Sequence, residues 1–251
     1  MGIKKLLNLS ISLAKADFKT RNEGSYLGIL WYLLNPILIF TLLLFLFSKR
    51  LGQDIPFYPL YLLLGVIMFS LFQQITSSSI TTMRANRLII KSLKFPLESL
   101  IASNVLRYLF VHIFEVIIFI AVMLILKVPI NPLVFYIPLL IFFCFFLYGF
   151  SLILSTLYIY FRDLENIWVF VTKLMFFATP IFYSIDSGSK IFIVNLLNPM
   201  FYFITIARDI IIYNKMPEFW MISITIIFSL LFLIIGSIIF KKTKSKFAEL
   251  M

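Results

Sequence analysis

The sequence predicts an all-α membrane protein with six transmembrane helices, an N-terminal amphipathic interface helix, and a re-entrant helix pair between spans five and six. Of the 251 residues, 62% are hydrophobic and only 13% are charged, and the mean hydropathy is +1.04. No soluble core needs that much apolar surface. The apolar runs are long enough to cross a hydrocarbon core of about 30 Å at about 1.5 Å per residue. Residues 1–251 are therefore expected to form a single transmembrane domain.

Residues 1–24 are expected to form an amphipathic helix that lies along the membrane surface. Polar residues recur there at helical spacing, namely Lys4, Asn8, Ser12, Lys15 and Lys19. The apolar residues fall largely on the opposite side of the same helix, which is typical of an interfacial helix. The segment has no compact apolar block followed by a small-residue cleavage site, so we do not expect a removable signal peptide.

Six apolar runs after this helix predict a six-span bundle over residues 28–240. The runs lie near residues 28–47, 58–82, 99–126, 132–160, 165–184 and 218–240. Residues 191–212 are apolar enough for a seventh crossing, but Asn198-Pro199 breaks that stretch in the middle. Residues 185–215 are therefore expected to dip into the outer leaflet and return as an extracytoplasmic gate segment, covered by protein or facing a water-filled cavity.

The distribution of Lys and Arg predicts that both termini, including the tail 241–251, are cytoplasmic. With six spans, fourteen of these residues fall on the face of the termini, namely Lys4, Lys5, Lys15, Lys19, Arg21, Arg84, Arg87, Lys91, Lys94, Arg162, Lys241, Lys242, Lys244 and Lys246. Six fall on the opposite face, namely Lys49, Arg50, Lys127, Lys190, Arg208 and Lys215. Positive residues gather on the cytoplasmic side of membrane proteins. A seventh span would place the lysine-rich tail outside, against this bias.

An ordered set of short motifs resembles the membrane subunits of ATP-binding-cassette (ABC) polysaccharide exporters. The motifs are Arg21, Gly24-Ser25, Leu27-Gly28, Trp31 and Pro36, then Phe95-Pro96-Leu97-Glu98, Phe161-Arg162-Asp163, Thr179-Pro180-Ile181-Phe182-Tyr183 and Asn198-Pro199-Met200. Each motif is weak by itself, whereas the ordered set is specific and covers nearly the whole chain. The resemblance implies a homodimeric permease of the cytoplasmic (inner) membrane. It would bind two copies of a cytoplasmic ABC ATPase and export a lipid-linked polysaccharide such as O-antigen, capsule or teichoic acid.

The sequence carries no nucleotide-binding motif of its own. Gly188-Ser189-Lys190 lacks both the first glycine of a phosphate-binding loop and a following Ser or Thr. We therefore expect no enzymatic activity and no cofactor in this chain, with ATP and Mg²⁺ bound by the partner ATPase. Cys144 is the single cysteine, which excludes an intrachain disulfide and a cysteine-based metal cluster. Membrane lipids are the other expected contact, and nucleic acid is not expected as a partner.

The cytoplasmic segment 84–98 is the predicted contact with the ATPase. Apolar and basic residues alternate there, and the expected interface residues are Arg84, Arg87, Leu88, Lys91, Lys94, Phe95, Pro96 and Glu98. An amphipathic element of this kind can set its apolar face in a groove of the ATPase. The alternative is a basic loop that rests on anionic lipid headgroups. The family resemblance favours coupling to the ATPase.

Arg21 is a candidate contact for the lipid diphosphate of the substrate. It lies at the expected cytoplasmic edge, where the substrate would enter, and a guanidinium matches phosphate oxygens in a fork. Ordinary contact with a lipid headgroup is the equally weighted alternative.

Charged or titratable residues inside the expected spans include His112, Glu115 and Lys173. His112 and Glu115 share one face of span three, and Lys173 lies in span five. Such residues cost roughly 2.5 to 3.5 kcal/mol each at mid-membrane on insertion scales. A structural pair of Glu115 with Lys173 is favoured over a proton relay, because no file of further titratable partners accompanies them.

Aromatic residues are expected to line the conduit, because sugar C–H faces stack on aromatic rings. The candidates are Phe40, Phe176, Phe177, Phe182 and Tyr183. For any single Phe, contact with lipid or packing between helices is the stronger alternative.

Three other functions were weighed against polysaccharide export. An ABC exporter of a drug or small lipid would share the fold. A proton-coupled secondary transporter would be expected to show internal repeats with interrupted helices, which the sequence lacks. A membrane-embedded glycosyl or prenyl transferase would need clustered carboxylates, whereas Asp17, Glu23, Glu98, Asp163 and Glu165 are scattered over separate loops.

Overall fold

A computed structural model describes residues 3–22, 30–92, 95–185 and 188–247, and within these ranges the chain contains helices and no strands. The elements are α1 (Ile3–Asn22), α2 (Leu30–Phe47), α3 (Tyr58–Ala85), α4 (Arg87–Ser92), α5 (Glu98–Ile125), η1 (Asn131–Phe135), α6 (Tyr136–Tyr160), α7 (Leu164–Ala178), α8 (Lys190–Asn195), α9 (Pro199–Ile211), α10 (Phe219–Thr243) and η2 (Lys244–Lys246). This agrees with the predicted all-α class.

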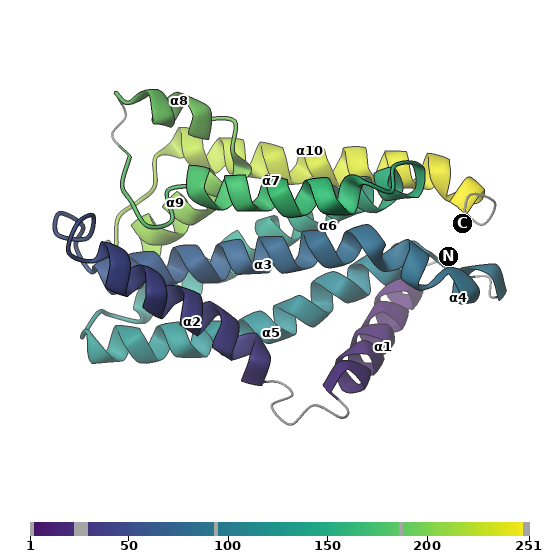
Figure 1. The fold of residues 1–251 in the computed structure, drawn as a ribbon, viewed down its shortest axis with the longest axis horizontal. Helices are drawn as coiled ribbons and strands as arrows, with labels where there is room; N and C mark the ends of the chain where they lie inside the picture. The colour runs from purple at the N-terminus through teal and green to yellow at the C-terminus, as the bar shows by residue number, and fades with distance from the viewer. Residues whose placement is uncertain (1–2, 23–29, 93–94, 186–187, 248–251) are drawn as a thin grey trace.

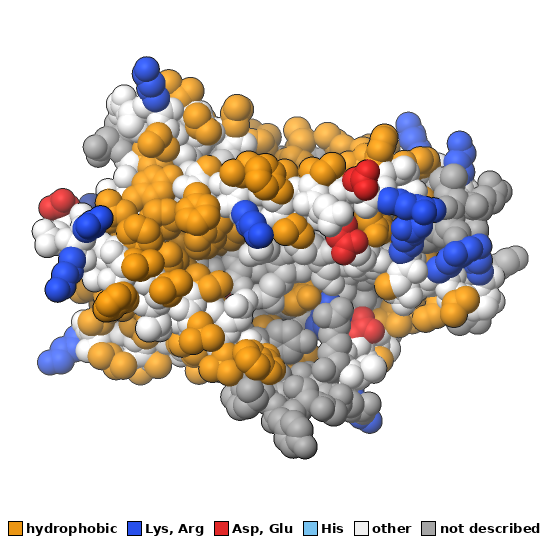
Figure 2. Space-filling view, in the orientation of Figure 1, with side chains coloured by type: hydrophobic (Ala, Val, Ile, Leu, Met, Phe, Trp, Pro, Cys, Tyr) orange, Lys and Arg blue, Asp and Glu red, His pale blue; other side chains and the backbone are white. Residues whose placement is uncertain are grey.

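The long helices lie side by side along the long axis of the molecule (Figure 1). The start of α1, the short helix α4 and the end of the described chain lie together at one end, while α8 and α9 lie at the other. Figure 2 shows hydrophobic side chains over the body of the molecule, with most Lys and Arg side chains gathered at its two ends. This arrangement is typical of a protein whose long axis crosses a bilayer.

Within the described ranges, four helices are long and apolar enough to cross a membrane, namely Tyr58–Ala85, Glu98–Ile125, Asn131–Tyr160 and Phe219–Lys246. They correspond to the predicted spans two, three, four and six. The runs predicted as spans one and five form shorter helices, α2 with 18 residues and α7 with 15 residues. At about 1.5 Å per residue, α7 alone is about 22 Å long, less than a hydrocarbon core of about 30 Å.

The early end of α7 has a local cause in the sequence. Pro180 disfavours the helical conformation of the residue before it, and Thr179 is accordingly extended at φ −74° and ψ 137°.

The predicted break at Asn198-Pro199 is also present, because α8 ends before it and α9 begins at Pro199. The Asn198 side chain caps α9 by accepting a hydrogen bond from the backbone N–H of Met200 at 3.1 Å.

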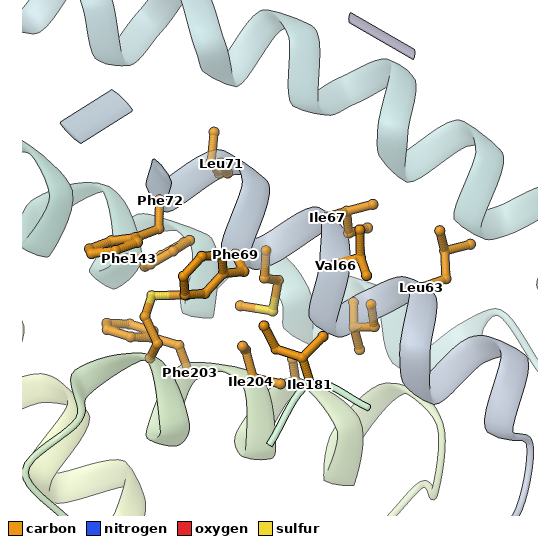
Figure 3. Packing of buried hydrophobic residues seen from close by; sticks show 14 of the residues in the cluster. Leu63, Val66, Ile67, Phe69, Leu71, Phe72, Phe143, Ile181, Phe203 and Ile204 are labelled. Atoms are coloured by element: carbon orange, nitrogen blue, oxygen red, sulfur yellow. The ribbon is translucent and has the colours of Figure 1, made fainter. Parts of the chain in front are cut away.

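The helix α3 forms the centre of the bundle and α10 its periphery. In the most apolar part of each helix, 78% of the α3 residues are buried but only 17% of the α10 residues. Figure 3 shows how Phe69 and Phe72 of α3 pack against Phe143 of α6 and Phe203 of α9. The polar residues of α3 are in part buried, such as Thr76, Ser79 and Thr82, and in part accessible, such as Gln73.

The helices α6 and α10 cross in close contact at two glycines. A Cβ atom on Gly149 would overlap the backbone of Phe232 in α10, and one on Gly236 would overlap the backbone of Gly149. Glycine is the residue that lets two helix backbones approach so closely. This crossing fixes α10 against the rest of the bundle.

Candidate functional site

The short helix α4 presents a free apolar and basic surface at the end that holds the termini. Leu88 is 83% exposed, and Arg87 and Lys91 are exposed beside it. On its other side, Ile90 is buried in a cluster that includes Phe240 of α10 and Phe247 of the tail. One side of α4 is therefore anchored to the bundle, and the other is open to a partner.

The remaining residues predicted for the coupling surface have different surroundings. Glu98 is buried, and its Oε1 lies 2.6 Å from Nζ of Lys244 beyond α10. The guanidinium carbon of Arg84 lies 5.8 Å from the ring centre of Tyr158. Phe95 and Pro96 are half-buried, and Lys94 lies outside the described residues. The exposed residues of α4 are therefore open to a partner, whereas the flanking residues Arg84 and Glu98 contact other parts of the bundle.

A polar stripe runs along α3 and lines a groove of about 380 Å³. Its members recur every three or four residues and are Ser70, Gln73, Gln74, Ser77, Ser78 and Thr81. This spacing places them on one face of the helix. Residues of α2, α5 and α7 complete the groove, namely Asn35, Ile39, Tyr108 and Phe176. The stripe was not predicted from the sequence, although polar residues at helical spacing inside an otherwise apolar run indicate such a stripe.

A second polar cavity of about 290 Å³ continues the stripe toward the end that holds α4, because both spaces are lined by Ser78 and Thr81. We call it the inner cavity. Asn104 of α5 donates a hydrogen bond to Thr82 Oγ1 there. Arg107 also lines it, and its Nη2 donates to Ser78 Oγ at 2.9 Å. The two spaces together form a polar path along α3.

Arg107 is a buried cation that the sequence analysis did not select. Its side chain is 3% exposed, and its Nη1 lies 3.7 Å from Oδ2 of Asp17 in α1. An arginine inside a membrane span costs roughly 2.5 to 3.5 kcal/mol on insertion scales and usually faces a cavity or the interior of a bundle. The signal available in the sequence was a lone Arg within the apolar run 99–126.

The five aromatic residues predicted to line the conduit differ in their surroundings. Phe176 lines the α3 groove, whereas Phe177 is exposed on α7. Phe182 is buried and stacks on Phe47 with ring centres 4.9 Å apart. Phe40 is half-buried against the core, and Tyr183 donates a hydrogen bond to the backbone oxygen of Ala178. The structure thus brings Phe176 to the polar path and leaves the other four away from it.

Arg208 of α9 binds the turn that follows α7. Its Nη1 donates to the backbone oxygen of Pro180 at 2.6 Å, and its Nη2 donates to that of Ile181 at 2.8 Å. It also donates to the backbone oxygen of Tyr61 in α3 from Nη2 at 2.9 Å and from Nε at 3.2 Å. The sequence analysis counted Arg208 among the charges of the outer face, but its side chain is 3% exposed. The guanidinium thus provides hydrogen bonds to the carbonyls of Pro180 and Ile181, which lie outside any helix.

Other polar side chains hold the same turn. Tyr58 donates to the backbone oxygen of Phe182 at 2.9 Å, and Tyr61 donates to that of Tyr183 at 2.7 Å. Asn198 donates from Nδ2 to Oγ1 of Thr179 at 2.8 Å. The segment 179–183, which we call the outer turn, is therefore fixed to α3 and α9 through its backbone.

A cavity of about 500 Å³ lies beside the outer turn and is lined by acidic and aromatic side chains. They include Asp54, Asp209 and Glu218, together with Tyr213 and Trp220. Burial raises the pKa of Tyr213 to about 12.

The intramembrane pair that the structure forms is His112 with Glu115. His112 Nδ1 lies 2.7 Å from Glu115 Oε2, and His112 Nε2 lies 2.7 Å from the hydroxyl of Tyr136. Lys173 is exposed on α7, and the ion pairs of the described residues do not join it to Glu115. The expected pair of Glu115 with Lys173 is thus replaced by a network between α5 and α6.

Arg21, the predicted diphosphate contact, lies in the last turn of α1, and its side chain lies outside the described part of the structure. Across the described ranges, no group of three or more His, Cys, Asp or Glu side chains is placed to hold a metal ion.

Comparison with known proteins identifies relatives that cover nearly the whole chain. The sequence pattern of the ABC-2 type transporter family matches residues 9–212. Two proteins of Klebsiella pneumoniae, both called O-antigen export system permease protein RfbA, are 32% identical over 250 residues and 31% identical over 249 residues. Each alignment covers 98% of this chain and 96% of the relative. A protein of the same name from Myxococcus xanthus is 28% identical over 254 residues, which covers 96% of this chain and 94% of the relative.

Proposed function

The chain belongs to the ABC-2 type transporter family, and we propose that it is the membrane subunit of an exporter that moves a lipid-linked polysaccharide across the cytoplasmic (inner) membrane. The curated relatives carry the name of O-antigen export permeases, which favours a polymer of the O-antigen type over a drug or a small lipid. The observation in the molecule that carries the proposal is the polar path along α3.

The chemistry of the path suits a sliding sugar chain. Hydroxyl and amide side chains both donate and accept hydrogen bonds, as sugar hydroxyls do. Each bond lost as the polymer advances can be replaced by the next residue of the stripe, such as Gln74 after Ser70. Phe176 and Tyr108 border the same groove and offer ring surfaces to sugar C–H groups.

We propose that two copies of the chain form the conduit between them. The α3 groove is open at the surface of the single chain rather than enclosed by it. The helix α2 beside it exposes Leu38, Leu42 and Phe45, apolar side chains that a second copy or lipid would cover. A twofold arrangement would close two half-grooves into one passage.

The proposed topology keeps six crossings, with α2 and α7 as the two short ones. The outer turn would extend α7 toward the outer surface, because its backbone is buried and hydrogen-bonded to protein. The helices α8 and α9 would form the re-entrant gate segment, and both termini would be cytoplasmic. The placement of α4 and both chain ends at one end of the bundle supports this topology (Figure 1).

The free side of α4 is the proposed contact with each of two ABC ATPase subunits. Leu88 would enter an apolar groove of the ATPase, and Arg87 and Lys91 would meet acidic groups at its rim. The ATPase would bind ATP and Mg²⁺.

The amphipathic helix α1 would lie at the same membrane surface, with Arg21 near the point where the substrate diphosphate enters.

Blocking the α3 groove tests the proposed function. Ser77→Phe places a ring in the groove, so export of the polysaccharide should fall at least tenfold in cells that carry only the variant. The matched control is Ser223→Phe, because Ser223 lies on α10 and its hydroxyl donates to Phe219 of the same helix. Membrane levels and ATPase copurification are measured for both variants. Full export by Ser77→Phe at normal levels would contradict the proposed path.

A further inference from the structure

Two cavities of different character meet at Arg107. One is the inner cavity of about 290 Å³, lined by hydroxyl, amide and carboxylate side chains. The other is an apolar cavity of about 380 Å³ between α1 and α5. Besides Arg107 it is lined by Ile11, Ala14, Lys15, Phe18, Leu106 and Phe110. The side chain of Arg107 therefore borders both a polar space and an apolar space.

Among the described residues, the guanidinium of Arg107 makes few polar contacts, and its carbon lies 4.6 Å from the ring centre of Tyr108. Its Nη2 donates to Ser78 Oγ, and its Nη1 lies 3.7 Å from Asp17, whose side chain is 49% exposed. Its Nε is buried and has no hydrogen-bond partner among the described residues. A buried cation with incomplete pairing is unfavourable, and an anionic oxygen in the inner cavity would complete its surroundings.

We propose that the two cavities together bind a lipid whose headgroup carries a phosphate or diphosphate. The phosphate oxygens would meet the guanidinium of Arg107 in the inner cavity, where Asn104 and Thr82 offer further polar groups. The hydrocarbon chain would occupy the apolar cavity between α1 and α5. The shape and chemistry of the paired space match such an amphiphile at both ends.

The position of Arg107 favours a lipid over a soluble phosphate. Arg107 lies nine residues after the start of α5, about 13 Å along the helix. A soluble anion would gain nothing from the apolar cavity. The hydrocarbon chain of a lipid, by contrast, would cover the apolar walls of that cavity. The proposal rests on the membrane placement of α1 and α5 and does not require polysaccharide export.

Photo-crosslinking of the full-length protein tests the site. Two probes are used in detergent micelles, phosphatidylglycerol and a polyprenyl diphosphate, each with a diazirine on its hydrocarbon chain. Peptide mass spectrometry should place the crosslinks on residues 11–18 and 106–110. Arg107→Gln should lower this labelling at least tenfold. The matched control Arg162→Gln, which removes an exposed cation outside both cavities, should leave it unchanged.

Two further variants separate binding from folding. Ala14→Trp fills the apolar cavity without touching the cation and should also abolish the labelling. Asp17→Asn removes the carboxylate that competes for Arg107 and should raise the labelling about twofold or more. Each variant is compared with the wild type by its elution from a size-exclusion column and by its melting temperature.

The outcomes decide both the site and the source of the lipid. Preferential labelling by the polyprenyl diphosphate identifies the substrate anchor, and preferential labelling by phosphatidylglycerol identifies a membrane lipid; either supports the site. Labelling that is equal in the wild type and Arg107→Gln, or labels outside α1 and α5 for both probes, would overturn it. The experiment contains no ATP or polysaccharide, so its failure would leave the export function standing.

Discussion

The guanidinium carbon of Arg208 lies 3.3 Å from the ring centre of Tyr61, and the same guanidinium donates to the backbone oxygen of that tyrosine. Tyr61 in turn donates its hydroxyl to the backbone of Tyr183. The central helix α3, the outer turn and α9 are thus joined through two side chains. We infer that any opening of the proposed gate segment moves α9 and the outer turn as one unit.

Arg208→Lys should destabilise the protein and lower export. An ammonium keeps the charge, but it cannot reach the three carbonyls that the guanidinium fork binds. Loss of charge-assisted hydrogen bonds worth roughly 1.5 to 3 kcal/mol each predicts a melting temperature lower by roughly 5 to 10 °C. Arg50→Lys, an exposed cation on the loop after α2, is the control. Equal melting temperatures for the two variants would show that the carbonyl contacts contribute little.

Gly236→Ala should weaken the crossing of α6 and α10. The added methyl group would overlap the backbone of Gly149, and backbone cannot rotate away as a side chain can. Overpacking of this kind costs typically 1 to 3 kcal/mol, so we expect a lower melting temperature and less protein in the membrane. Gly188→Ala makes the same chemical change where nothing lies within 4 Å of the new atom. It should leave both measurements unchanged, and a comparable loss there would contradict the packing argument.

Arg87→Glu combined with Lys91→Glu should lower copurification of the ATPase at least tenfold. The double change inverts the charge on the exposed side of α4 and leaves the buried Ile90 in place. Lys241→Glu with Lys242→Glu inverts the same charge in the last turn of α10, at the same end of the bundle as α4 (Figure 1). If both double variants lose the ATPase equally, general electrostatics and not α4 governs binding. If neither loses it, α4 rests on lipid headgroups instead.

Glu115→Gln should affect stability more than energy coupling. The amide keeps a hydrogen-bonding group beside His112 but cannot release a proton. Export driven by ATP should therefore stay within about twofold of the wild type when a protonophore collapses the proton gradient. The melting temperature should fall, because a buried charge-assisted hydrogen bond is weakened. Export that stops with the protonophore or in Glu115→Gln, while ATP is present, would favour the proton relay that the sequence left open.

Much of the fold could be predicted from the order of residues along the chain. Long uncharged runs, such as the one that forms α6, must be helical in a membrane because every backbone group needs an internal partner. The break at Asn198-Pro199 is equally local, because proline restricts the residue before it. The predicted span 165–184 ran past Thr179-Pro180, whereas α7 ends at Ala178. The short helix α4 lies in the segment 84–98, where apolar and basic residues alternate, and its contact with the ATPase stays a prediction.

The candidate site depended on contacts between distant residues. Arg107 and Arg208 are each a single cation in an apolar run, and nothing local distinguishes them from Lys173, which is exposed. Their roles come from partners far along the chain: Ser78 and Asp17 for Arg107, and backbone oxygens of α3 and the outer turn for Arg208.

The sequence by itself determined the all-α membrane class, the four long apolar helices and the break at Asn198-Pro199, because hydropathy, helix length and proline act over neighbouring residues. Only the tertiary structure decided which polar groups share a space. The stripe on α3 became one wall of a groove when α2, α5 and α7 packed beside it. Glu115 met His112 and Tyr136 rather than Lys173 because burial selects the partners that the packed helices bring within hydrogen-bond distance.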